Sequence, residues 1–137
     1  MYKILLLSHG RFCEGALDTL KIFLPDTDFV TAIPFYTQGV NGDELLEAYT
    51  ASIAADDVVL VFTDLLTGSV NQKVMQGLGQ LPNVLVVTGF NLPALFEAAT
   101  LDEDSATPEQ LRALLPGWRE GLMYMADYQP ETFADDE

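Results

Sequence analysis

The stretch Tyr2-Lys3-Ile4-Leu5-Leu6-Leu7-Ser8-His9-Gly10 decides the fold class, because a mainly apolar run ends abruptly in small and polar residues. Residues 2–7 have the continuous apolar pattern of a strand that is buried on both faces, which is typical of a parallel sheet. Gly10 breaks this strand, and the single histidine of the chain, His9, stands at its carboxyl end. Sites in open α/β sheets lie at this edge. His9 is therefore the first candidate for chemistry.

The rest of the chain alternates between strand and helix patterns. The predicted strands cover residues 2–7, 29–35, 57–62 and 83–88. Helical spacing of apolar residues follows over residues 12–24, 45–53 and around 74–78, then from Asn91 as a cap, and over 108–121 with an interruption at Pro116-Gly117. Residues 122–128 fit either a last helical turn or a fifth strand. This order of elements predicts a parallel sheet with helices on both faces.

We therefore predict an α/β fold: a three-layer sandwich around a mostly parallel sheet of four to five strands. The length of 137 residues and a 49% hydrophobic composition suit one core. We expect a single domain over residues 1–130 and an acidic, frayed tail over residues 131–137.

Charge and composition exclude several classes of function. The chain has 21 acidic and 6 basic residues, a net charge of −15, which repels nucleic acid and anionic membranes and favours basic protein partners. Its apolar runs are far shorter than the roughly 20 residues of a membrane span, and the start lacks the pattern of a signal peptide. These features indicate a cytoplasmic protein. Cys13 is the single cysteine, which excludes an internal disulfide.

A second polar segment, residues 63–72, follows the most apolar predicted strand. If the strands at 2–7 and 57–62 are neighbours, their carboxyl ends bring His9 and Asp64 together. A carboxylate that accepts a hydrogen bond from Nδ1–H leaves the Nε2 lone pair free as a nucleophile and stabilises the ring once it is cationic. No second histidine or nearby cysteine completes a metal site, so we expect no metal and no cofactor.

The residues around this pair point to phosphate. Gly10 opens one helix and Thr67-Gly68-Ser69 opens another, and free backbone amides at helix N-termini bind phosphate. The hydroxyls of Thr67 and Ser69, with Arg11, could offset repulsion between a phosphoryl group on His9 and ionised Asp64. Each hydroxyl could equally cap its helix.

Three other interpretations use the same residues. A response-regulator receiver has an acidic pair after its first strand to hold Mg²⁺, where this chain has Ser8-His9. A histidine phosphatase has Arg-His-Gly and a further histidine, whereas this chain has His9-Gly10-Arg11. Both therefore fail. A histidine with a purely structural role at a strand end remains the plainest alternative.

These residues resemble the mannose-type enzyme IIA domains of the bacterial phosphoenolpyruvate-dependent sugar phosphotransferase system. The resemblance rests on three motifs in order: Ser8-His9-Gly10 after a strand, Thr63-Asp64-Leu65 leading to Gly68-Ser69, and residues 88–97, which are similar to the Gly-x-Asn-Leu-Pro-Met-Leu segment of the family. It implies that His9 accepts a phosphoryl group from the phosphocarrier HPr and passes it to an enzyme IIB, with Asp64 orienting the ring.

The resemblance also implies a wider assembly. Enzyme IIB phosphorylates a sugar that arrives through the membrane subunits IIC and IID, so the chain would reach the membrane through protein partners. Members are typically homodimers that exchange a C-terminal strand, for which we expect residues 122–128. Where many members have Gly-Gly-Ser-Pro-x-Asn, this chain has Thr67-Gly68-Ser69-Val70-Asn71-Gln72. The loss of one glycine leaves open a regulatory binding module without efficient transfer. The resemblance itself leaves a second alternative, a phosphodonor to a dihydroxyacetone kinase, because a subset of the family has that role.

Overall fold

Four parallel strands form the central sheet: β1 (Tyr2–His9), β2 (Val30–Phe35), β3 (Val58–Thr63) and β4 (Val84–Thr88). Their order across the sheet is β2-β1-β3-β4. In this computed structural model residues 1–130 are described, and the predicted tail at 131–137 lies outside the described residues. From β1 the chain first adds β2 on one side, and it then crosses back to add β3 and β4 on the other side. The strand order therefore reverses between β1 and β3, and this position is the topological switch point of the sheet. Open α/β sheets bind ligands at such a point.

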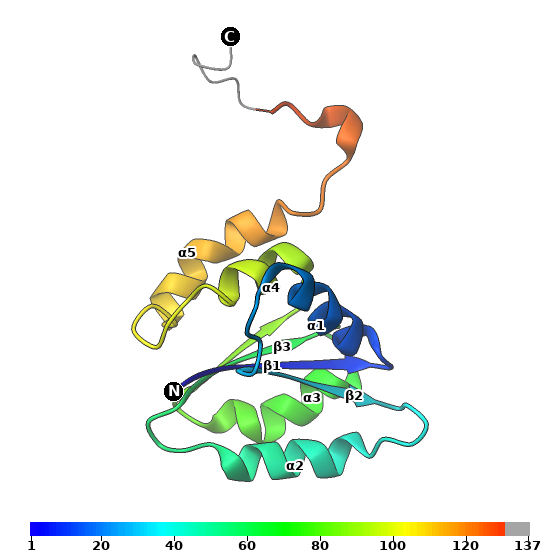
Figure 1. Cartoon of the computed structure of the whole chain (residues 1–137), viewed down its shortest axis with the longest axis vertical. Helices are drawn as coiled ribbons and strands as arrows, with labels where there is room; N and C mark the ends of the chain where they lie inside the picture. The colour runs from blue at the N-terminus through cyan, green and yellow to red at the C-terminus, as the bar shows by residue number, and fades with distance from the viewer. Residues whose placement is uncertain (131–137) are drawn as a thin grey trace.

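Helices cover both faces of the sheet (Figure 1). On one face lie α1 (Phe12–Phe23), α4 (Leu92–Ala98) and α5 (Pro108–Arg119), and on the other lie α2 (Gly42–Ser52) and α3 (Ser69–Gln76). Two short 3-10 helices, η1 (Leu78–Gln80) and η2 (Met125–Asp127), complete the described elements. The predicted three-layer α/β architecture with a parallel sheet is confirmed, with four strands in residues 1–130.

The central strand β1 supplies both halves of the core. Ile4 and Leu6 pack under α1, α4 and α5, while Leu5 and Leu7 pack against α2 and α3, and all four side chains are fully buried. Side chains alternate between the faces of a strand, so an unbroken apolar run is what a strand covered on both sides needs. The predicted strand at residues 2–7 is therefore confirmed, with two more residues at its end.

The helix ends follow local signals in the sequence. The Asn91 side chain accepts a hydrogen bond from the Ala94 amide (2.9 Å) and so caps α4, as predicted. Asn41 caps α2 in the same way, through the Glu44 amide at 3.2 Å. Leu24, just before Pro25, has an extended backbone and ends α1.

The interruption predicted at Pro116-Gly117 is wrong, because α5 continues to Arg119. Proline removes one backbone hydrogen bond from a helix, but the next turn is anchored by Trp118, which is 5% exposed. The Trp118 indole donates to Glu97 Oε1 (2.9 Å), and its ring centroid lies 6.0 Å from that of Phe62. These tertiary contacts outweigh the missing hydrogen bond.

The segment after α5 leads away from the body of the molecule (Figure 1). Of the two structures that the sequence allows for residues 122–128, the single chain has a short helical turn, η2, and no strand there. Most of its large side chains are exposed. None of the helices in residues 1–130 is long and apolar enough to cross a membrane.

Candidate active site

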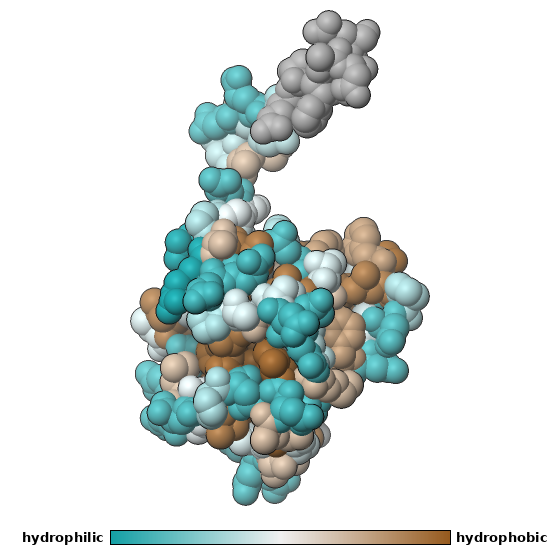
Figure 2. All heavy atoms as spheres, turned by 90° about the vertical axis from the view of Figure 1, so that its left-hand side faces the viewer, coloured by the Kyte–Doolittle hydropathy of each residue, from teal (hydrophilic) through white to brown (hydrophobic). Residues whose placement is uncertain are grey.

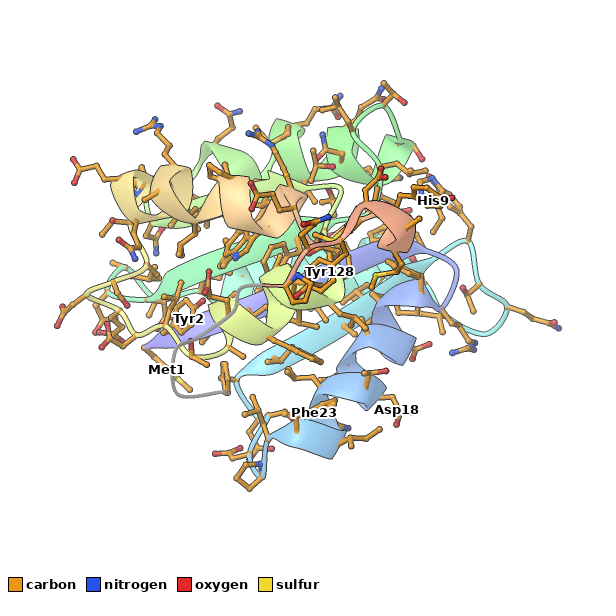
Figure 3. The ribbon with its side chains drawn as sticks, turned by 90° about the horizontal axis from the view of Figure 1, so that it is seen from above. Met1, Tyr2, His9, Asp18, Phe23 and Tyr128 are labelled. Atoms are coloured by element: carbon orange, nitrogen blue, oxygen red, sulfur yellow. The ribbon has the colours of Figure 1, made fainter. Side chains whose placement is uncertain are left out.

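His9 and Asp64 lie in contact at the carboxyl ends of β1 and β3. His9 Nδ1 is 3.0 Å from Asp64 Oδ2, and the His9 backbone amide donates to the same oxygen at 2.8 Å. The His9 side chain is 37% exposed, and that of Asp64 is 12% exposed. His9 lies far from the start of β1, where Met1 and Tyr2 are (Figure 3). The topology thus brings together two residues that are 55 positions apart.

Asp64 is suited to hold the His9 ring in one tautomer. Partial burial acts to raise the pKa of the Asp64 carboxyl, but hydrogen bonds from the His9 backbone and ring outweigh it, and the pKa lies below its usual value. Leu65 adds a third hydrogen bond, from its amide to Asp64 Oδ1 at 3.0 Å. An ionised carboxylate is only an acceptor, so the tautomer of His9 that fits this contact has its proton on Nδ1 and its lone pair on Nε2.

Gly68 gives the His9 ring its space. A Cβ at this position would lie 2.9 Å from His9 Cε1, closer than side-chain carbons approach in proteins. Gly68 is also the N-cap of α3 and receives no side-chain cap, so neither Thr67 nor Ser69 caps this helix. Thr67 is exposed, next to Gly68. The amides of the first turn of a helix have no partners within the helix, and those of α3 begin beside the ring.

Gly10 shapes the turn after β1. It has a positive φ of 60°, a conformation that favours glycine. Its amide donates to the Phe35 carbonyl at 2.7 Å, so this N–H is engaged by the protein. Ser8 stabilises the same turn, since its Oγ donates to the Gly10 carbonyl and accepts from the Cys13 amide. Arg11 is exposed and paired with Glu14 (2.6 Å).

Tyr36 is a neighbour of the site that the sequence reasoning missed. Its ring centroid lies 5.4 Å from that of His9, and its hydroxyl is 2.7 Å from Ser69 Oγ. Tyr36 follows β2 directly and is the one non-glycine residue of the described chain with a positive φ, 59°. The sequence did carry a signal for it: Tyr36 directly follows a predicted strand, as His9 and Asp64 also lie at the ends of strands.

A polar network supports the loop that carries Asp64. The Thr63 hydroxyl contacts Thr88 Oγ1 (2.7 Å) and Asn71 Oδ1 (2.8 Å), while the Asn71 amide group donates to the Leu66 carbonyl (3.2 Å). Strands β3 and β4 and helix α3 are thereby tied together beneath the loop. Within residues 1–130, no group of three or more possible metal ligands gathers at this or any other place.

Comparison with known proteins identifies the relatives of this arrangement. The profile of the EIIA-man family, described as the PTS system fructose IIA component, matches residues 3–115. The structure is similar to that of the PTS IIA protein associated with the fucose utilization operon of Streptococcus pneumoniae, with a TM-score of 0.71 and 32% identity over 91% of this chain and 93% of that chain.

Two further solved structures agree. One is the mannose/sorbose specific IIA subunit from Enterococcus faecalis, with a TM-score of 0.69 and 25% identity over 96% of this chain and 98% of that one. The other is a candidate permease of the same system from Klebsiella pneumoniae, with a TM-score of 0.77 and 25% identity over 92% of each chain. The predicted family is confirmed: the chain belongs to the mannose family of EIIA proteins, the phosphocarriers of the sugar phosphotransferase system.

Proposed function

We propose that His9 accepts a phosphoryl group from phospho-HPr through Nε2 and passes it to an enzyme IIB for sugar uptake. The contact between His9 Nδ1 and Asp64 Oδ2 carries this proposal, because it directs the Nε2 lone pair outward. The place of both residues at the switch point of the sheet supports it.

Transfer at this site needs no proton to move. The Nε2 lone pair of His9 forms a new N–P bond in line with the bond that breaks, and the electron pair of the broken bond returns to the donor imidazole. Nδ1–H stays bonded to Asp64, which stabilises the positive charge that the ring acquires. Onward transfer to an acceptor histidine on enzyme IIB is the same kind of step with His9 as the donor: the acceptor nitrogen forms the new N–P bond and the electron pair of the broken bond returns to His9 Nε2.

The phosphoryl group would lie at the N-terminus of α3. We assign the amides of the first turn, the Ser69 hydroxyl and the exposed Thr67 hydroxyl as its hydrogen-bond donors, because they flank Gly68, which lies next to the ring. The Gly10 amide already donates to Phe35, so we assign Gly10 to the shape of the turn beside the phosphate. The glycine retained from the family pattern, Gly68, is the one that the ring requires, which favours transfer over a binding module without activity.

The charge of the chain suits the proposed partners. A net charge of −15 attracts a phosphocarrier with a basic face and speeds their encounter. We expect the chain to act in the cytoplasm and to reach the subunits IIC and IID through enzyme IIB.

A chase experiment tests the proposed route. Protein phosphorylated by phosphoenolpyruvate, enzyme I and HPr, then freed of them, should lose its phosphate within minutes of adding a matching enzyme IIB. Phosphate that stays on His9 with an active enzyme IIB would contradict this route, and loss to a dihydroxyacetone kinase instead would identify the alternative acceptor.

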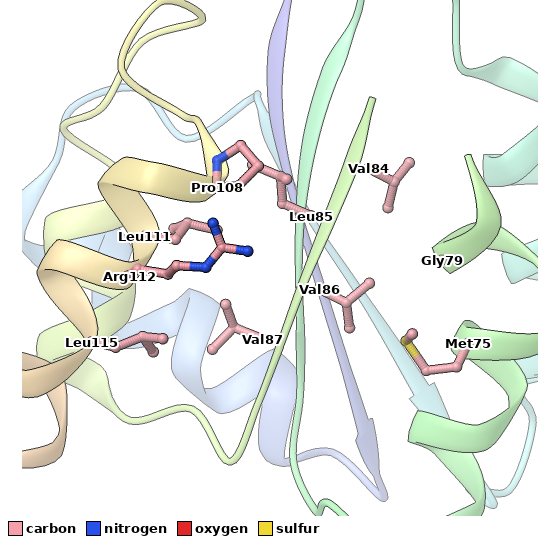
Figure 4. A pocket seen from close by; sticks show the side chains of 10 residues that line it. All are labelled: Met75, Gly79, Val84, Leu85, Val86, Val87, Pro108, Leu111, Arg112 and Leu115. Atoms are coloured by element: carbon pink, nitrogen blue, oxygen red, sulfur yellow. The ribbon is translucent and has the colours of Figure 1, made fainter. Parts of the chain in front are cut away.

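We also propose that two copies form a dimer by exchanging a strand at residues 122–128. β4 pairs with β3 on one side, and a groove of about 340 Å³ runs along its other side. Figure 4 shows apolar side chains from α3 and α5 on the two sides of this strand. An added antiparallel strand would satisfy the backbone groups of such an edge.

Exposed apolar side chains supply the second half of this argument. Those of the segment after α5 are Leu122 (90% exposed), Met123 (46%), Tyr124 (73%), Met125 (68%) and Tyr128 (47%). Hydrophobic surface also gathers between hydrophilic bands on the face in Figure 2.

Light scattering should give a dimer for the wild type and a monomer for the double variant Leu122→Lys, Met123→Lys. Ile22→Lys, a change at an exposed residue of α1, is the control, and a monomeric wild type would contradict the dimer.

A further inference from the structure

Tyr36 has an unusual backbone for its residue type. A φ of 59° is unfavourable for a bulky aromatic residue, and such strain gathers at functional sites. The preceding residue, Phe35, is tied to the end of β1 through the Gly10 amide. The chain therefore turns sharply after β2, and the turn brings the Tyr36 ring beside the ring of His9, 5.4 Å between centroids.

The Tyr36 hydroxyl has a specific partner. It lies 2.7 Å from Ser69 Oγ, although Tyr36 itself is 62% exposed. A phenol is a stronger acid than an aliphatic alcohol, so the stable direction of this bond has Tyr36 donating and Ser69 accepting. A serine hydroxyl has a single proton and two lone pairs. When Oγ accepts from Tyr36, the Ser69 proton stays free for a third group.

The position of Gly68, the residue before Ser69, indicates what this third group is. Ser69 directly follows Gly68, where a Cβ would lie 2.9 Å from His9 Cε1, the ring carbon between Nδ1 and Nε2. Nδ1 contacts Asp64, which leaves Nε2 as the ring nitrogen for the phosphoryl group. The Ser69 hydroxyl does not cap α3. A phosphoryl group on Nε2 would therefore have the Ser69 hydroxyl on its side of the ring, with the proton of Ser69 available to it.

We propose that Tyr36 is a positioning residue for phosphoryl transfer: it holds the Ser69 hydroxyl in place as a hydrogen-bond donor to the phosphoryl group on His9. This inference rests on the proposed carrier function. Tyr36 does not touch the phosphoryl group in this role, and it acts through Ser69. The chain Tyr36–Ser69–phosphoryl also polarises each hydroxyl, so both hydrogen bonds gain strength as charge develops on the transferred group.

A double-mutant cycle tests the coupling. Single-turnover transfer from phospho-HPr is measured for the wild type, Tyr36→Phe, Ser69→Ala and the double variant. Tyr36→Phe keeps the ring and loses the hydroxyl, and we expect its maximal rate to fall about three- to tenfold, the worth of one hydrogen bond. We expect the HPr concentration at half-saturation to stay the same. The double variant should be no slower than Ser69→Ala alone, because Tyr36 acts through Ser69.

Tyr49→Phe is the matched control. Its hydroxyl is buried on α2 without a hydrogen-bond partner in the described residues, so its loss should leave transfer unchanged. A Tyr36→Phe rate equal to wild type, or losses that add in the double variant, would overturn the role of Tyr36 and leave the carrier function intact. A wild type that takes up no phosphate from active phospho-HPr would overturn the carrier function and this role with it.

Discussion

Replacing Gly68 by alanine tests the geometry of the site most finely. The Gly68 backbone has φ −77° and ψ 155°, which alanine adopts without strain. The effect must therefore come from the new methyl group, which would lie 2.9 Å from His9 Cε1 and 3.2 Å from Leu65 Cβ. Ordinary contact begins at 3.4 Å, so the His9 ring and the loop must separate by about 0.5 Å.

This displacement sets the expected magnitude. A misplacement of about 1 Å can cost about 100-fold in rate, so half that distance predicts a loss of about tenfold in phosphoryl transfer to His9. Overpacking costs about 1–3 kcal/mol, and the reduced freedom of the unfolded chain returns about 0.4–1 kcal/mol. We expect the variant to be folded, with a free energy of unfolding lowered by between about 0 and 2.6 kcal/mol.

The assay is single-turnover transfer from phospho-HPr, followed by intact mass, with ¹⁵N NMR of the imidazole to report the tautomer. Gly117→Ala is the control, because a Cβ there meets nothing within 4 Å and α5 lies outside the site. A Gly68→Ala variant with the wild-type rate and an unmoved His9 signal would refute the claim that Gly68 fixes the ring.

Three other substitutions have definite expected outcomes. Asp64→Asn should slow phosphorylation of His9 on the order of 100-fold, because a neutral amide stabilises the cationic ring poorly, and a wild-type rate would exclude the orienting role. Asp57 is buried; the hydrogen bond from the Ala54 amide, followed by that from Lys3, lowers the pKa of its carboxyl. The ionised Asp57 carboxylate therefore stabilises the fold fully above its unfolded pKa near 4, and this stabilisation is lost as the pH falls through the lower native pKa. In urea titrations, Asp57→Asn should make the free energy of unfolding depend less on pH between about pH 5 and 2 than it does in the wild type. An unchanged pH dependence would contradict this. Asn91→Ala removes the α4 cap and should lower the free energy of unfolding by about 1–3 kcal/mol in urea followed by tryptophan fluorescence, and a change below about 0.5 kcal/mol would count against the cap.

Much of the fold could be predicted because its signals are local. The apolar run of β1 matches a strand buried on both faces, and Asn91 acts as a cap through a hydrogen bond three residues away. The contact of His9 with Asp64 followed from one assumption, that β1 and β3 are neighbours, and the strand order satisfies it. Strand ends in a parallel sheet meet at one edge, so pairs of this kind can be inferred without side-chain detail.

The failures have a common physical cause, which is dependence on distant contacts. Pro116 is a local signal for a helix end, but the burial of Trp118 overrides it. Tyr36 was missed because its position beside His9 depends on a positive φ that residue type does not suggest. The Gly10 amide was expected to be free, and its bond to Phe35 depends on how β1 and β2 pair.

Intact mass spectrometry after incubation with phosphoenolpyruvate, enzyme I and HPr tests the central claim most directly. The account predicts one acid-labile phosphate on the wild type and none on His9→Ala. Folded wild-type protein that gains no phosphate beside phosphorylated HPr, or a His9→Ala variant that gains it equally, would contradict His9 as the phosphoryl carrier.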